Sequence, residues 1–117
     1  EQVNIFLNNI KTGGLPVMEV DVVKGLKAIE KLKVDMLKAQ WTYQEGSLKG
    51  LEGDILKGLA ETVSICYLLA RRLGYDFSKL DRTLLQILEE WKEEDYNKLE
   101  SQWGDISLLI GYLAPDE

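Results

Sequence analysis

Apolar residues recur at steps of three and four along four stretches of the chain, the spacing that gathers side chains on one face of an α-helix. The first long helix is predicted from about Glu19 to Tyr43. Its apolar stripe consists of Val22, Leu26, Ile29, Leu32, Met36, Ala39 and Tyr43. A loop is expected to follow at Gly46, Ser47 and Gly50.

The second predicted helix, from about Gly53 to Leu73, is apolar on most of its sides. One stripe is formed by Ile55, Leu59, Val63, Cys66, Ala70 and Leu73, and much of the remaining surface by Leu56, Ile65, Leu68 and Leu69. Helices of this kind are usually the buried centre of a bundle. Cys66, the only cysteine, is accordingly expected to be a buried structural thiol.

Two further helices are predicted nearer the C-terminus. The first begins at Ser78 as its N-cap, with Asp81 three residues later in a capping-box-like pair. The second runs from about Asn97 to Leu113. Its inward-facing residues are Trp103, Ile106, Leu109, Ile110 and Leu113.

The pattern as a whole predicts an all-α, four-helix bundle over residues 17–117 with short connections. No internal repeat or low-complexity linker divides this domain further. Gly13, Gly14 and Pro16 break the chain before it, so residues 1–16 are expected to form a short N-terminal arm.

Charge and composition remove several classes of function. The chain has 117 residues and a formal net charge of −6, which argues against free DNA or RNA as a partner. It has no histidine, so Ser-His-Asp catalysis, Cys-His catalysis and His-ligated zinc are excluded. Its longest nearly apolar stretch, residues 62–70, is about half the length that a bilayer requires. We therefore expect a cytoplasmic protein that binds neither nucleic acid nor membrane.

Carboxylates are the remaining candidates for metal-dependent chemistry. Glu90 and Glu93 form an E-x-x-E pair, but Lys92 and the polar surroundings favour a solvated helix end. Glu61 lies in the middle of the second predicted helix, beside an apolar run. It either pairs with Lys57 one turn earlier or lies at the rim of a ligand-binding cleft.

Two blocks of sequence resemble the MazG-like proteins of Gram-positive bacteria and their phages. The first block comprises LKG at 48–50, Ala60, and YLLARRLG at 67–74. The second is WGDISLL at 103–109, closed by Tyr112 and Leu113, and it is similar to the G-D-[LI]-S-x-L-x-x-Y-L ending of that group. The likeness covers about Val22 to Leu113 and implies the all-α fold of the nucleoside triphosphate pyrophosphohydrolases.

Active members of that group cleave a nucleoside triphosphate to the monophosphate and pyrophosphate. They hold magnesium with an E-x-x-E pair on one helix and an E-x-x-D pair on the next, and the metal neutralises phosphate charge. In this chain the last acid of the second pair falls on Glu61. Its partner falls on Gly58, or on Lys57 if the register slips by one.

The first pair falls near Ala39 and Thr42, with Lys38 alongside. Glu61 is therefore the one metal-ligand candidate that the resemblance leaves. Other acids that could contribute from unexpected positions are Asp35, Glu45 and Asp54. Magnesium is expected as a cofactor only if the chain is a hydrolase.

These observations together predict a MazG-like domain that binds a nucleotide or nucleotide-derived signal with weak or no pyrophosphohydrolase activity. The candidate binding residues are cations for phosphates, aromatic rings for a base, and one acid: Lys38, Trp41, Lys57, Glu61, Tyr67 and Arg71.

Two alternatives remain open. One is an active magnesium-dependent hydrolase with a rearranged acid set. The other is a non-enzymatic interaction module whose acidic segment, residues 89–100, contacts a basic partner. Because small helical bundles with apolar sides on several helices commonly self-associate, we also expect a homo-oligomer.

Overall fold

The structure is a computed structural model that describes residues 17–115, so the predicted arm lies outside the described residues. Helices and turns make up this part of the chain, and the all-α prediction is confirmed. The chain divides into two compact units, Glu1–Gly74 and Tyr75–Glu117. Within residues 17–115, none of the helices combines the length and apolar character needed to cross a bilayer.

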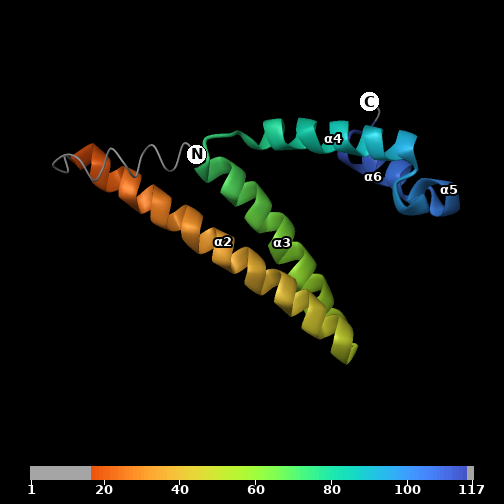
Figure 1. Ribbon diagram of the computed structural model, residues 1–117, viewed down its shortest axis with the longest axis horizontal. Coiled ribbons are helices and arrows are strands. Elements are labelled where there is room, and N and C mark those ends of the chain that lie inside the picture. The colour runs from red at the N-terminus through yellow and green to blue at the C-terminus, as the bar shows by residue number, and fades with distance from the viewer. Residues whose placement is uncertain (1–16, 116–117) are drawn as a thin grey trace. The chain divides into compact units, whose positions relative to one another are not determined.

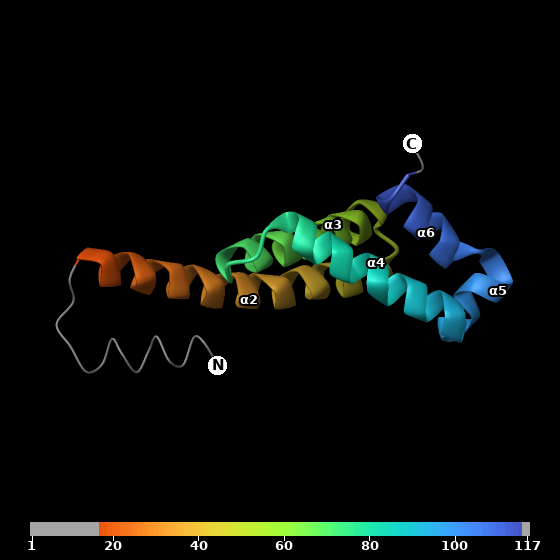
Figure 2. The ribbon, with the colours of Figure 1, turned by 90° about the horizontal axis from the view of Figure 1, so that it is seen from above.

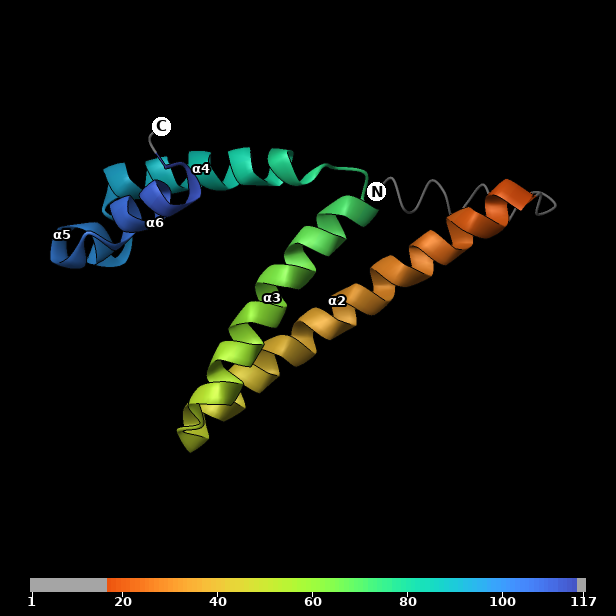
Figure 3. The same cartoon turned by 180° about the vertical axis from the view of Figure 1, so that it is seen from behind.

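The first unit contains a helical hairpin. Helix α2 (Val17–Lys49) leads into a turn, and α3 (Glu52–Arg72) returns along it (Figure 1). The two helices are closest near this turn and diverge toward their other ends, as the view from behind also shows (Figure 3). The bounds of α3 agree with the prediction to within one residue at each end.

The predicted loop from Gly46 onward is wrong, because α2 continues through Gly46 to Lys49. The chain reverses at Gly50, whose φ of 70° is a left-handed conformation that favours glycine. The Leu51 amide then donates a 2.8 Å hydrogen bond to the Gly46 carbonyl. Gly46 therefore lies within α2, where it packs against α3, and Gly50 forms the turn.

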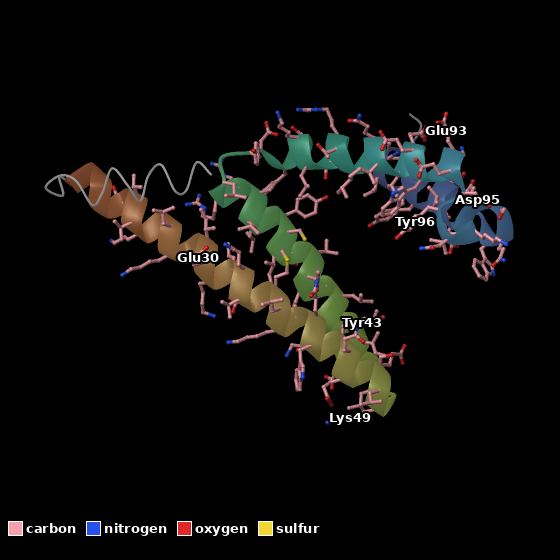
Figure 4. The ribbon with its side chains drawn as sticks, in the orientation of Figure 1. Glu30, Tyr43, Lys49, Glu93, Asp95 and Tyr96 are labelled. Carbon is pink, nitrogen blue, oxygen red and sulfur yellow. The ribbon has the colours of Figure 1, made fainter. Side chains whose placement is uncertain are left out.

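Two glycines allow the backbones of α2 and α3 to approach each other closely. A Cβ added at Gly58 would lie 2.5 Å from the Tyr43 nitrogen and 2.8 Å from the Ala39 carbonyl oxygen. One added at Gly46 would lie 2.8 Å from the Asp54 Cβ. Ala39 is only 3% exposed at the same contact, which lies beside Tyr43 (Figure 4).

The hairpin covers one side of α3 and leaves another apolar side open. Leu56, Leu59 and Val63 are 60%, 46% and 57% exposed, and Cys66 is half-buried. Contact with α2 alone therefore makes neither this helix a buried centre nor Cys66 a buried thiol. Because α2 contacts α3 along one face, it cannot cover a helix that is apolar on most of its sides.

The second unit is built on the pairing of α4 (Phe77–Glu94) with α6 (Asp105–Leu113), seen from above in Figure 2. Leu88 and Ile106, at 5% and 3% exposure, are its buried apolar side chains. Between these helices lie the 3₁₀-helix η1 (Tyr96–Lys98) and the short helix α5 (Leu99–Trp103).

Helix α4 begins two residues earlier than predicted. Asp76 is its N-cap, because the Asp76 carboxylate accepts a 2.8 Å hydrogen bond from the Lys79 amide. Ser78, the predicted N-cap, instead donates its hydroxyl proton to the same carboxylate over 2.9 Å. These two hydrogen bonds lower the pKa of Asp76, the one from Lys79 contributing most.

The last predicted helix is interrupted at Gly104, whose φ of 69° separates α5 from α6. The apolar spacing of a helix thus continues across a break in the backbone. The helix predicted from Asn97 to Leu113 is two short helices in the structure. Trp103, which we expected to face inward, is 67% exposed, whereas Ile106 is buried as expected.

Two carboxylates hold the interrupted segment in place. Glu100 accepts hydrogen bonds from the hydroxyl and the amide of Ser107, on the other side of the break. Asp95 accepts one from the Ser101 amide, in the region where Trp91 stacks on Tyr96 with 4.1 Å between ring centroids (Figure 4). Hydrogen bonds from Ser107 lower the pKa of Glu100, and hydrogen bonds from Ser101 lower that of Asp95.

Replacement of Gly58 by alanine tests the close helix contact. The added Cβ meets backbone atoms of α2 that cannot move independently, so Gly58→Ala should lower the free energy of unfolding by about 1–3 kcal/mol. Gly25→Ala, in open space within α2, should raise it by about 0.5–1 kcal/mol. Urea unfolding measures both; equal effects of the two substitutions would contradict this account.

Acid should weaken the second unit through Glu100. A carboxyl whose pKa is lower in the folded than in the unfolded chain stabilises the fold above its unfolded pKa. That stabilisation is lost as the pH falls from about 4.3, the ordinary value for glutamate, through the lower folded value. Tryptophan fluorescence should report a flatter pH dependence of unfolding in Glu100→Gln. Glu93→Gln, on an exposed residue of α4, should keep the wild-type profile.

Candidate functional site

A groove of about 530 Å³ lies between α2 and α3. It is lined from α2 by Asp35, Lys38, Ala39 and Thr42, and from α3 by Lys57, Ala60, Glu61, Ser64 and Ile65. On each helix these positions follow steps of one, three and four, so they form one face. The groove therefore brings together three of the predicted binding residues, namely Lys38, Lys57 and Glu61.

The groove contains the positions to which the family resemblance assigns metal ligands. Ala39 and Thr42 line it from one helix, and Glu61 lines it from the other. Of the two alternatives for the fourth position, Lys57 lines the groove, whereas Gly58 is buried in the contact between the helices. In the register that places this partner on Lys57, the three-residue spacing places the last acid on Ala60, and both residues line the groove.

Charges in the groove are balanced, with two lysines and two acids. Asp35 is ion-paired with Lys31, whose ammonium lies 2.5 Å from an Asp35 carboxylate oxygen. Ion pairs of the hairpin include Lys31–Asp35, Lys33–Glu30 and Lys49–Glu45. None of these joins Lys57 to Glu61, so the interpretation of Glu61 as the partner of Lys57 is wrong for the described side chains.

The donor set does not suit magnesium held by the protein alone. Mg²⁺ prefers several oxygen ligands in octahedral geometry, and here two carboxylates line the groove, one of them already paired. Within the described part of the chain, no cluster of three or more His, Cys, Asp or Glu side chains could hold a metal ion. The groove can instead offer two ammonium groups, two hydroxyls and a carboxylate to a polar ligand.

Arg71 lies in a second hollow, further along the same two helices. This basic hollow has a volume of about 410 Å³ and is lined by Ala28, Lys31, Leu32, Leu68, Arg71 and Arg72. It has three cations and no carboxylate among these residues. The Lys31–Asp35 ion pair links it to the groove, because Lys31 lines the hollow and Asp35 lines the groove.

The two predicted aromatic residues lie elsewhere. Trp41 is 64% exposed and lines neither the groove nor the basic hollow. Tyr67 also lines neither of them. Ring chemistry favours both aromatic residues as base-stacking candidates, but it does not indicate which side of the helix faces the other helix.

Sequence reasoning missed Ser64 and Lys31. Ser64 follows Glu61 by three residues and Lys57 by seven, so extending the face of Glu61 by helical steps identifies it. Lys31 precedes Lys38 by seven residues, which also places it on the face of the groove residues. Nothing in the local sequence distinguishes it from the other lysines of α2.

Comparison with known proteins identifies the family of the chain. The sequence model described as the MazG-like family matches residues 22–106, well over half of the chain. The chain therefore belongs to the MazG-like family. No curated protein and no solved structure matches it.

Adding acids to the groove should create a metal site. Lys38→Glu combined with Lys57→Glu would line the groove with four carboxylates, two from each helix. Titration calorimetry should then detect Mn²⁺ binding that is absent or at least tenfold weaker in the wild type, about 1.4 kcal/mol or more.

Lys24→Glu combined with Lys27→Glu is the matched control, because it changes the charge equally at exposed positions of α2 that line neither hollow. Equal Mn²⁺ binding by the wild type and both variants would mean that the groove acids do not determine metal affinity.

Proposed function

We propose that this MazG-like domain binds a nucleotide or a nucleotide-derived phosphate compound between α2 and α3, with weak or no pyrophosphohydrolase activity. The observation that carries the proposal is the groove itself. Its lining includes Lys57 of α3, where active relatives are expected to have a metal-binding acid if the register slips by one. It also includes Lys38 of α2, beside the expected first acid pair at Ala39 and Thr42.

Direct contact by lysine offers a physical substitute for the metal. Ammonium groups bind phosphate oxygens through charge-assisted hydrogen bonds, which are stronger than hydrogen bonds between neutral groups. Thr42 and Ser64 supply hydroxyls in the same groove, and Glu61 can accept hydrogen bonds from sugar hydroxyls or base amino groups. Arg71 in the basic hollow extends the cationic surface beyond the groove.

Weak or absent hydrolysis follows from the same residues. Metal-assisted phosphoryl transfer requires a cation that neutralises the developing charge and a base that orients water. Lysines neutralise phosphate charge, but they cannot act as Lewis acids that activate water. With one unpaired carboxylate in the groove, binding is better supported than turnover.

Binding should depend on the groove lysines and not on added magnesium. Calorimetric titration with a panel of nucleoside mono-, di- and triphosphates should show at least one ligand that binds without Mg²⁺. Lys57→Ala should weaken the affinity for this ligand about tenfold, because a hydrogen bond to a charged group is removed. Lys24→Ala, on exposed α2 surface outside both hollows, is the matched control.

The alternatives make different predictions in the same experiments. Rapid pyrophosphate release that is lost in Glu61→Gln would establish a hydrolase with a rearranged acid set. If no ligand of the panel binds or raises the melting temperature, the nucleotide proposal fails and a protein-interaction module becomes the better account.

A further inference from the structure

The groove and the basic hollow follow one another along the same face of the helical hairpin. Their lining positions, 28 to 42 on α2 and 57 to 72 on α3, advance by steps of one, three and four on both helices. At 1.5 Å per residue, the middle of the hollow lies about 13 Å from the middle of the groove along either helix. One ligand that lies between the helices can therefore occupy both.

The two hollows differ in their chemistry. The groove offers ammonium groups, hydroxyls and a carboxylate, which suit phosphates and a sugar. The basic hollow instead has an apolar part formed by Ala28, Leu32 and Leu68. Leu68 is 50% exposed and Leu32 is half-buried, so a ligand has apolar surface to cover there. Apolar surface bordered by cations suits a flat ring with polar atoms at its edge.

The polar side chains of the basic hollow can donate hydrogen bonds but cannot accept them. They are Lys31, Arg71 and Arg72, and no carboxylate, hydroxyl or amide side chain lines the hollow with them. A ring edge that carries acceptors would find partners in this hollow. An amino group on the ring would be left without a partner, at a cost in binding free energy.

Among the common bases, guanine matches such a set of donors best. Its O6 and N7 are two adjacent acceptors, whereas adenine has an amino group beside N7 and cytosine has one at N4. The planar guanidinium of arginine donates two parallel hydrogen bonds to O6 and N7. A second guanidinium can stack on the face of the same ring, so Arg71 and Arg72 together can hold both the edge and the face.

The dimensions favour a nucleotide with more than one phosphate. The volume of the hollow, about 410 Å³, is in the range of small-molecule pockets. In a nucleoside monophosphate, a single ribose separates the base from the phosphate, which is too short for a span of about 13 Å. A di- or triphosphate extends far enough for its terminal phosphates to reach Lys38 and Lys57 in the groove.

We propose that the basic hollow is the base site of the ligand, and that Arg71 and Arg72 give it a preference for guanine. The ligand is then a guanine nucleoside di- or triphosphate whose phosphates lie in the groove. This inference rests on the proposed function, because the groove has to hold the phosphates. It also supplies a place for the base, since Trp41 and Tyr67 line neither hollow.

Calorimetric titration of the full chain with GDP, ADP, CDP and UDP, without Mg²⁺, tests the base preference. The wild type should bind GDP about tenfold more tightly than the other three, the size of discrimination that a bidentate arginine–guanine contact gives. It should bind 7-deaza-GDP more weakly than GDP, because that analogue lacks the N7 acceptor.

Arg71→Lys combined with Arg72→Lys should remove the preference for GDP and leave the affinity for ADP unchanged, because the positive charges remain and the planar forks are lost. Arg82→Lys is the matched control, on an exposed residue of α4, and should keep the preference. Lys57→Ala should weaken all four nucleotides alike, as expected for a phosphate contact.

The outcomes separate this inference from the proposed function. Nucleotides that bind without base preference overturn the inference alone, and so does a double arginine variant that weakens GDP and ADP equally, because the arginines would then contact phosphate. If none of the nucleotides binds, both proposals fail. Circular dichroism checks that the double variant is folded; if it is not, the comparison of GDP with 7-deaza-GDP on the wild type decides, and equal affinities overturn the inference.

Discussion

Helices α2 and α3 approach each other backbone to backbone where Gly58 lies against Ala39 and Tyr43. Since no side chain separates the helices there, the rotation of α3 about its axis is fixed relative to α2. Lys57 and Glu61 consequently line the groove, and Leu56 is left exposed on another side of the helix. The groove and the open apolar surface of the hairpin both depend on this contact.

The same contact explains why the groove differs from a magnesium-binding site. A carboxylate at position 58 would require space that the α2 backbone occupies, and position 57, which does line the groove, holds lysine. The remaining acids are Glu61 and the ion-paired Asp35. The balance of two lysines and two acids in the groove thus results from the helix packing and from the residues at the groove positions. This balance is the basis for proposing a ligand bound by lysines.

In the second unit, hydrogen bonds to carboxylates fix the positions of the helices. Glu100 connects the two sides of the Gly104 break through Ser107, and Asp76 caps α4. Apolar periodicity predicts one helix through Gly104, and the capping-box-like pair of Ser78 and Asp81 predicts a cap at Ser78. The first prediction is wrong because apolar spacing is preserved across a short break. The second is wrong because two neighbouring polar residues can each suit a cap until the backbone conformation selects one.

The sequence by itself determined the all-α class, the positions of the main helices and, through the resemblance, the family to which the chain belongs. It also selected Lys38, Lys57 and Glu61 as candidates, and these three residues line the groove because helical spacing places them on facing sides of α2 and α3. Only the tertiary structure decided that Trp41 lies outside the groove, that Gly58 is buried, and that α3 has an open apolar side. A helix with several apolar faces does not specify which face meets its neighbour; that choice depends on close contacts between residues far apart in sequence.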